Sequence, residues 1–185
     1  PLVIGTIPFV EDPSPQQIQA LSNGDASLQT SAEGVTNFIR GGTNVEKAFN
    51  FFIATNFTTE QASGMIAGLV EASTDKMLPD IDADGSYGIA QWPKLETEGN
   101  RYQNLLYFAG NRGLQPTSIE AQLQFVLYEL RTYPYLGLGQ LKRTRTVSEA
   151  AEIFSTKYQT WTAQTPARKA ARKSKAQEIF GRFTR

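Results

Sequence analysis

Four helix-start signals along the chain constrain its fold more than any other feature. In a capping box, a Ser or Thr hydroxyl accepts a hydrogen bond from the backbone N–H three residues later, and a Glu or Gln there bonds back. The candidate boxes pair Thr43 with Glu46, Thr58 with Gln61, Thr117 with Glu120 and Thr146 with Glu149. Apolar residues after these boxes recur at intervals of three and four, the period of a helix face. A mainly α fold is therefore expected.

Six helices are expected in all, joined by segments with turn signals. They are predicted over residues 43–56, 58–73, 100–110, 117–131, 146–161 and 165–183. Residues 74–90 are predicted to form a long loop rich in Asp and Gly, and residues 133–139, YPYLGLG, a turn-rich break. A short hairpin within 80–92 is the one exception expected to an otherwise helical chain.

The first 42 residues differ in kind from the rest. Four of the nine prolines lie within the first 15 residues, together with two apolar pieces, LVI at 2–4 and IPFV at 7–10. An extended arm over 1–42 is predicted, followed by one domain over 43–185. Two interpretations stay open for the arm: a flexible terminus, or a segment that docks on a partner protein.

Composition excludes several classes of active site. The chain has no Cys and no His, which rules out disulfides, thiolate nucleophiles, histidine triads and the usual zinc sites. An enzyme without His is expected to transfer protons through a carboxylate, a Tyr or a Lys. The formal net charge is zero and no apolar run approaches about 18 residues. No cofactor, no nucleic-acid partner and no membrane span are therefore expected.

Glu71 is the first candidate for such a proton-transfer group. It follows Leu69 and Val70 near the C-terminal end of an apolar helix. The helix dipole and the apolar surroundings both disfavour a negative charge there, which favours the protonated form that a general acid needs. The alternative is an ordinary solvated glutamate at a helix end.

A second candidate segment, residues 85–92, reads GSYGIAQW. Its aromatic rings and amide, Tyr87, Gln91 and Trp92, could stack on sugar rings and bond to sugar hydroxyls. The alternative is a Trp buried in the core and a Gln that caps a backbone group.

Taken together, these two segments resemble the phage tail lysozyme family of the lysozyme and lytic transglycosylase superfamily. The resemblance covers roughly residues 45–180. Beyond the two segments, the matching positions in this range are Arg101, Gln122, Leu123, Phe125, Glu129, Leu130, Arg168, Ala171 and Ala176. It implies a lysozyme-like helical domain that cleaves peptidoglycan and is carried in the virion on the phage tail or baseplate. The expected partners are then peptidoglycan and other tail or baseplate proteins, the latter through residues 1–42.

The resemblance also implies roles for particular residues. Glu71 would protonate the β-1,4-glycosidic oxygen. In the transglycosylase route Glu71 then acts as base and the 6-hydroxyl of the sugar attacks, whereas the hydrolytic route needs a second carboxylate. The loop contains four aspartates, Asp75, Asp80, Asp82 and Asp84. Asp80 and Asp84 are the preferred candidates for this second carboxylate. Sugar contacts are expected from Ser73, Tyr87, Gln91, Trp92 and Tyr158.

Two departures from the family pattern weigh against activity. Ala72 stands where the family has Ser, and Gln159 stands where an aromatic residue is usually followed by Glu. The alternative function is therefore a structural tail or baseplate component with an inactive lysozyme fold. A free endolysin or a bacterial housekeeping transglycosylase is a third hypothesis.

Two charged stretches complete the sequence-level hypotheses. Asp80, Asp82 and Asp84 occupy the first, third and fifth positions of an EF-hand-like loop, but the twelfth position is Gln91, so a solvated acidic loop is preferred to a calcium site. The last third is rich in Lys and Arg. It is interpreted as a solvated helix face, with attraction to anionic cell-wall polymers as the alternative.

Overall fold

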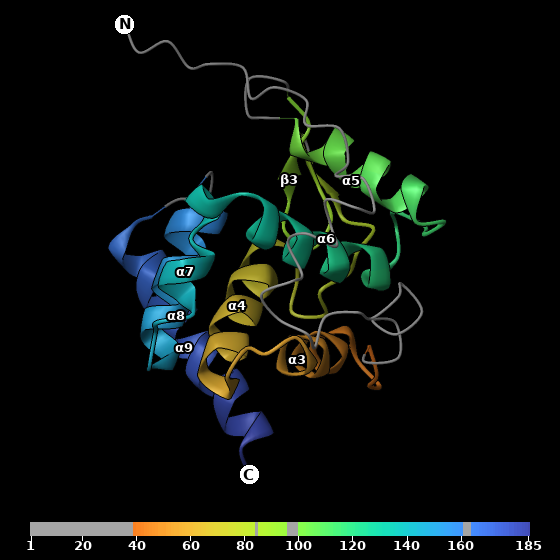
Figure 1. Ribbon diagram of the computed structural model, residues 1–185. Helices are drawn as coiled ribbons and strands as arrows, with labels where there is room; N and C mark the ends of the chain where they lie inside the picture. Colours follow the sequence, from red (N-terminus) through yellow and green to blue (C-terminus); the bar gives the residue numbers. More distant parts are fainter. Residues whose placement is uncertain (1–38, 84, 96–99, 161–163) are drawn as a thin grey trace, which may run out of the picture.

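The computed structural model describes residues 39–83, 85–95, 100–160 and 164–185, and within them it is mainly helical, as the sequence predicts (Figure 1). The α-helices are α3 (Asn44–Ala54), α4 (Thr59–Ala72), α5 (Arg101–Asn111), α6 (Ile119–Thr132), α7 (Leu138–Leu141), α8 (Val147–Ile153) and α9 (Pro166–Phe183). No helix in these ranges is long and apolar enough to cross a membrane. The arm predicted over 1–42 lies outside the described residues except at 39–42.

Three of the four predicted capping boxes form, and the fourth is wrong. Thr43, Thr58 and Thr146 each accept a hydrogen bond from the backbone three residues later, and the side chain there bonds back. Before α6, however, it is Ser118 that has the extended backbone of an N-cap, and its hydroxyl accepts from the Ala121 N–H at 3.1 Å. The helix therefore begins at Ile119, one residue later than a box at Thr117 would place it.

The helix predicted over 146–161 is shorter and changes form. Helix α8 ends at Ile153 and continues as a π-helical turn, η3 (Phe154–Tyr158). The wider turn places the Tyr158 ring against that of Phe154, with ring centroids 4.7 Å apart. The predicted break over 133–139 contains a 3₁₀ turn, η2 (Pro134–Leu136), and the start of α7.

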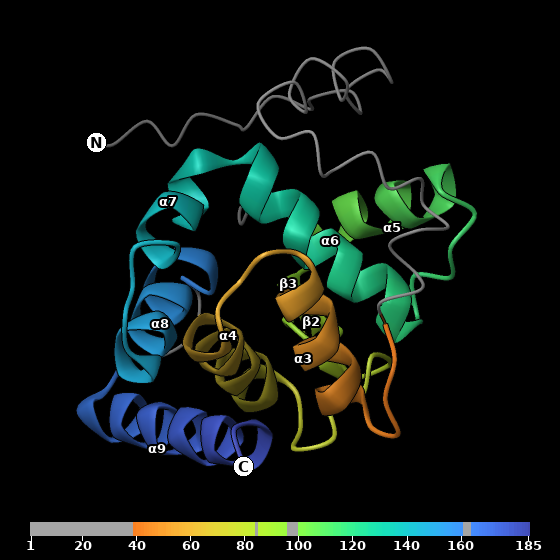
Figure 2. The ribbon, with the colours of Figure 1, turned by 60° about the horizontal axis from the view of Figure 1, so that its bottom comes forward.

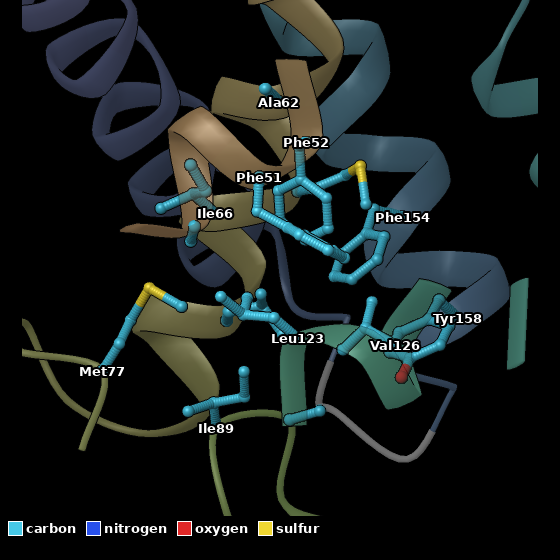
Figure 3. Close-up of a cluster of buried hydrophobic side chains, with 14 of the residues drawn as sticks. Phe51, Phe52, Ala62, Ile66, Met77, Ile89, Leu123, Val126, Phe154 and Tyr158 are labelled. Atoms are coloured by element: carbon cyan, nitrogen blue, oxygen red, sulfur yellow. The ribbon is translucent and has the colours of Figure 1, made fainter. Parts of the chain in front are cut away.

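Helix α4 lies at the centre of the domain, between α3, α8 and α9 (Figure 2). Ten consecutive residues of α4, 61–70, are buried. Glycine permits the closest of these approaches, because a Cβ at Gly64 would lie 2.5 Å from the Ala151 nitrogen, and one at Gly68 would lie 2.5 Å from the Gln159 Oε1. Aromatic and aliphatic side chains from α3, α6 and η3 fill the core beside it, among them Phe52, Leu123 and Phe154 (Figure 3).

A small antiparallel sheet covers the end of the core next to α5 and α6. Its strands are β1 (Asp82–Ala83), β2 (Ser86–Tyr87) and β3 (Trp92–Pro93), in that order. Tyr87 pairs with Asp82 on one side and with Trp92 on the other. The hairpin expected within 80–92 is confirmed, and β3 adds a third strand to it.

One side chain of α6, that of Gln122, connects this sheet region to the helices. Its Oε1 accepts from the Ile89 N–H at 2.9 Å, and its Nε2 donates to the carbonyls of Pro79 at 2.6 Å and Pro116 at 2.8 Å. Gly88 has a φ of +76°, and a Cβ there would lie 2.7 Å from the Gln122 Oε1. The fully buried amide is therefore the hydrogen-bond partner of three backbone groups far apart in the sequence.

We expect Gln122→Leu to lower the free energy of unfolding by about 2–4 kcal/mol, because it leaves buried backbone groups without partners. Gln124→Leu on the same helix is the matched control, since the Gln124 Nε2 is buried without a hydrogen-bond partner among the described residues. Urea unfolding of both variants measures the difference. A loss as large in Gln124→Leu as in Gln122→Leu would contradict this role of Gln122.

Candidate functional site

Glu71 lies in the last turn of α4, and two arginines of α9 reach its carboxylate. The Arg172 Nε donates to the Glu71 Oε2, and the Arg168 Nε lies 3.7 Å from the Glu71 Oε1. The Glu71 side chain is 21% exposed, whereas that of Arg172 is only 2% exposed. Glu71 is thus partly open to solvent on one side and held by a buried cation on the other.

The burial of Arg172 corrects the interpretation of the last helix as an entirely solvated basic face. Arg172, Ala176 and Ile179 form the buried side of α9. Their spacing of four and three is the ordinary signal of an inward helix face, and it could have identified Arg172 in the sequence. The Arg172 Nη1 also contacts the Gln164 Oε1 at 3.4 Å, while its Nη2 is buried without a hydrogen-bond partner among the described residues.

The segment after Glu71 carries the remaining carboxylates predicted for the site. The Ser73 hydroxyl donates to the Leu69 carbonyl at 2.7 Å and so caps α4. Asp75 lies 3.5 Å from the Lys175 Nζ, and Asp80 is exposed. Asp82 forms an ion pair with Lys94, whose ammonium also lies over the Tyr87 ring. Asp84 lies outside the described residues.

No metal centre is evident in the part of the chain that the structure describes. There, no group of three or more Asp, Glu, His or Cys side chains lies close enough together to hold an ion. The carboxylate of Asp82 already has a cationic partner in Lys94. The calcium hypothesis for the acidic loop therefore gains no support from these residues.

Trp92 and Tyr158 lie in the interior, so neither ring has surface on which a sugar could stack in this structure. Trp92 lies on β3, whose two residues are both buried, and its ring packs against Phe125 with centroids 5.3 Å apart. For Trp92 this is the core position that the sequence left as an alternative.

Gln91 and Tyr87 are also largely buried. The Gln91 Nε2 donates to the carbonyls of Gly88 at 2.8 Å and Ile81 at 3.3 Å, and its Oε1 accepts from the Ser86 hydroxyl at 2.7 Å. The amide is thus the backbone cap that the sequence offered as the alternative to a sugar contact. Burial and the neighbouring Tyr102 and acidic side chains raise the pKa of Tyr87.

Trp92 and Tyr158 belong to a largely buried polar cluster, in which they and Arg101 donate hydrogen bonds to Glu129. The Arg101 Nε and Nη2 donate to the two Glu129 oxygens at 2.6 and 2.7 Å. The Trp92 Nε1 and the Tyr158 hydroxyl donate to Glu129 Oε2 at 2.8 and 2.6 Å. The four residues come from β3, α5, α6 and η3, so this cluster joins elements from most of the domain.

The electrostatics of the cluster follow from its burial. Burial lowers the pKa of Arg101, but the charge and hydrogen bonds of Glu129 outweigh it, and the pKa is raised. Burial and then the Glu129 charge raise the pKa of Tyr158 well above its ordinary value. Arg101 therefore stays charged and Tyr158 stays a hydrogen-bond donor across the physiological range.

We expect Glu129→Gln to destabilise the fold by about 3–5 kcal/mol, because it leaves the buried Arg101 guanidinium without its counter-ion. Glu152→Gln is a matched control. Its pair with Lys173 at 2.8 Å is about 40% exposed, and such surface pairs contribute about 0–1 kcal/mol. Denaturant unfolding of the two variants compares them, and equal losses would argue against the importance of the buried cluster.

Comparison with known proteins adds one positive finding. A family model described as phage tail lysozyme matches residues 43–183. This range begins at the N-cap of α3 and ends with the last residue of α9. No curated protein sequence matches the chain.

Proposed function

The chain belongs to the phage tail lysozyme family, and on that premise we propose that it cleaves the β-1,4-glycosidic bond of peptidoglycan with Glu71 as general acid. The observation that carries this proposal is a contrast between two glutamates that each form an ion pair with an arginine. The Glu129 side chain is 2% exposed and its oxygens accept four hydrogen bonds, whereas that of Glu71 is 21% exposed. Of the two, only Glu71 has an oxygen that a substrate could reach.

The contacts of Glu71 support different roles for its two carboxylate oxygens. Oε2 accepts from the buried Arg172, while the contact recorded for Oε1 among the described residues is with Arg168 at 3.7 Å, whose side chain is 53% exposed. In the proposed mechanism Oε1 carries the proton that passes to the glycosidic oxygen, so the bond to the leaving sugar breaks as the O–H bond forms. Arg172 fixes the orientation of the carboxyl group and stabilises the charge that develops on it as the proton leaves.

The surroundings favour the route that needs no second carboxylate. The described aspartates of the loop are exposed or paired with lysines, and the side chain at 159 is a buried amide that donates to the Gly68 carbonyl at 3.2 Å. In this transglycosylase route Glu71, now ionised, removes the proton of the 6-hydroxyl, whose oxygen then attacks the anomeric carbon. The product carries a 1,6-anhydro end, whereas a reducing end would indicate hydrolysis with a carboxylate such as Asp80 or Asp84.

We place the enzyme in the virion, on the phage tail or baseplate, where local cleavage of the wall would assist penetration. Family membership suggests a tail-associated location, and residues 1–42 are the segment we assign to contacts with other tail or baseplate proteins. The second candidate function is a structural tail component. It is favoured by Ala72 and Gln159, the two departures from the family pattern.

We expect Glu71→Gln to lower the rate of peptidoglycan cleavage by about 10²–10⁴-fold, the usual contribution of a general acid. Clearing of a suspension of purified sacculi measures the rate. Glu178→Gln on α9 is the control, because Glu178 is an exposed partner of Lys175. Inactivity of the wild type as well would support the structural function, and undiminished activity of Glu71→Gln would show that another residue is the acid.

Arg172 is proposed as a positioning residue, so its loss should lower kcat more than it raises KM. Because a hydrogen bond to a charged group contributes about 1.5–3 kcal/mol, Arg172→Met should reduce kcat by roughly tenfold or more. Arg172→Lys should restore part of the rate, and Arg168→Met, which removes only the 3.7 Å contact, should have a smaller effect. A change in KM alone in Arg172→Met would contradict the assignment.

A further inference from the structure

A hollow of about 410 Å³ lies away from Glu71, at the surface formed by η2, α7 and η3. It is lined by Pro134, Tyr135, Gly137, Gly139, Gln140, Arg143 and Lys157. Its volume is within the range of about 300–1,000 Å³ that is usual for sites that bind small molecules or parts of larger ones. The turn-rich YPYLGLG sequence, which the proposed reaction does not use, thus forms one wall of a concave surface.

Glu71 and this hollow lie near opposite ends of α4. At the start of α4, the Gln61 Nε2 donates to the Lys142 carbonyl at 3.1 Å and to the Thr144 carbonyl at 3.4 Å. Arg143 is the residue between these two, so its backbone lies beside the first turn of α4. Glu71 is ten residues further along the helix, a rise of about 15 Å. Both ribbon views show α8 between α7, which borders the hollow, and α9, which contacts Glu71 (Figures 1 and 2).

The charge of the hollow is positive and uncompensated. Arg143 and Lys157 line it, and no lining residue is acidic. Neither cation forms an ion pair with another described residue, whereas Lys173, Lys175 and Arg182 elsewhere on the surface each have a glutamate within 2.8 Å. Two neighbouring cations without an acidic partner favour binding of an anion, and an arginine and a lysine together suit a carboxylate or a phosphate group.

Backbone geometry keeps one of these cations at the wall of the hollow. Gly137 has a φ of +86°, and a Cβ there would lie 2.7 Å from the Lys157 Cβ. The glycine therefore lets the lysine stem pack directly against the turn. The Cβ and Cγ of Lys157 therefore lie beside Gly137, while Lys157 as a whole is exposed at the rim of the hollow.

The remaining wall suits a sugar. The Tyr135 side chain is 60% exposed although it is a large aromatic residue, and its ring is supported by Tyr133 with centroids 5.7 Å apart. An exposed aromatic face stacks well on the apolar face of a pyranose ring. The exposed Gln140 amide adds both a donor and an acceptor for hydroxyl groups.

We propose that this hollow binds an anionic group, a carboxylate or a phosphate, that is displayed on a saccharide polymer of the bacterial cell wall. Arg143 and Lys157 contact the anion while Tyr135 and Gln140 contact the adjoining sugar. The site rests on the proposed function only in its choice of polymer, because the hollow does not include Glu71. Its effect is to hold the domain on the wall at a second point, away from the acid.

Co-sedimentation of the full chain with purified sacculi tests the site. Arg143→Gln/Lys157→Gln should weaken binding by about tenfold or more, since it removes both charge-assisted contacts to the anion. Arg145→Gln/Arg185→Gln is the matched control, because it removes two exposed positive charges outside the hollow. Tyr135→Ala should also weaken binding, and added salt should weaken the wild type more than the double variant in the hollow.

Chemical treatment of the sacculi identifies the anion. If amidation of the carboxyl groups abolishes the difference between wild type and the double variant, the ligand is a carboxylate. If extraction of phosphate-containing polymers abolishes it, the ligand is a phosphate. Equal binding by the hollow variant and the control, or a difference that survives both treatments, would overturn the proposal.

Binding by Glu71→Gln separates this site from the catalytic proposal. Loss of cleavage with normal sedimentation leaves the hollow intact as a binding site. Normal cleavage by Glu71→Gln, with weaker sedimentation of the hollow variant, would instead remove the catalytic assignment and keep the binding site.

Discussion

Helix α4 is enclosed on all sides along residues 61–70, and this enclosure determines where function can lie. A helix buried in this way can offer polar groups only at its two ends. Small residues make the enclosure possible, since Gly64 lies against the backbone of α8 and Gly68 against Gln159. The two sites proposed for this domain lie near the two ends of α4, with Glu71 in its last turn and the hollow that includes Arg143 near its first turn.

Two glutamate–arginine pairs in the domain show how burial separates structure from chemistry. The Glu129 side chain is 2% exposed and that of Arg101 is 12% exposed, and a tryptophan and a tyrosine also donate hydrogen bonds to Glu129. In such a setting both carboxylate oxygens already accept hydrogen bonds inside the protein, so we assign this pair to the stability of the fold. Glu71 and Arg172 have the same chemical groups, but the carboxylate keeps access to solvent. The difference in exposure, not in residue type, makes one pair a fold element and the other a candidate site.

The local signals in the sequence predicted much of the fold correctly. Capping boxes at Thr43, Thr58 and Thr146 act within a single turn, so they can be recognised without knowing what the helix packs against. The prediction was wrong in two places. Ser118, not Thr117, is the N-cap of α6, and a π-helical turn replaces the end of the helix that was predicted to reach residue 161. The short hairpin was expected, but its third strand depends on pairing with β2 and had no local signal.

By itself the sequence determined the helical class, the family resemblance, the exclusion of His and Cys chemistry and the choice of Glu71 as candidate acid. Only the tertiary structure decided what surrounds these residues. In the structure Trp92 and Tyr158, which were expected to contact sugars, lie in the core. Arg172 donates to the carboxylate of Glu71, which is 101 residues earlier in the chain. The physical reason is that capping and helix periodicity depend on residues three or four apart, whereas burial and ion pairing depend on how distant helices pack.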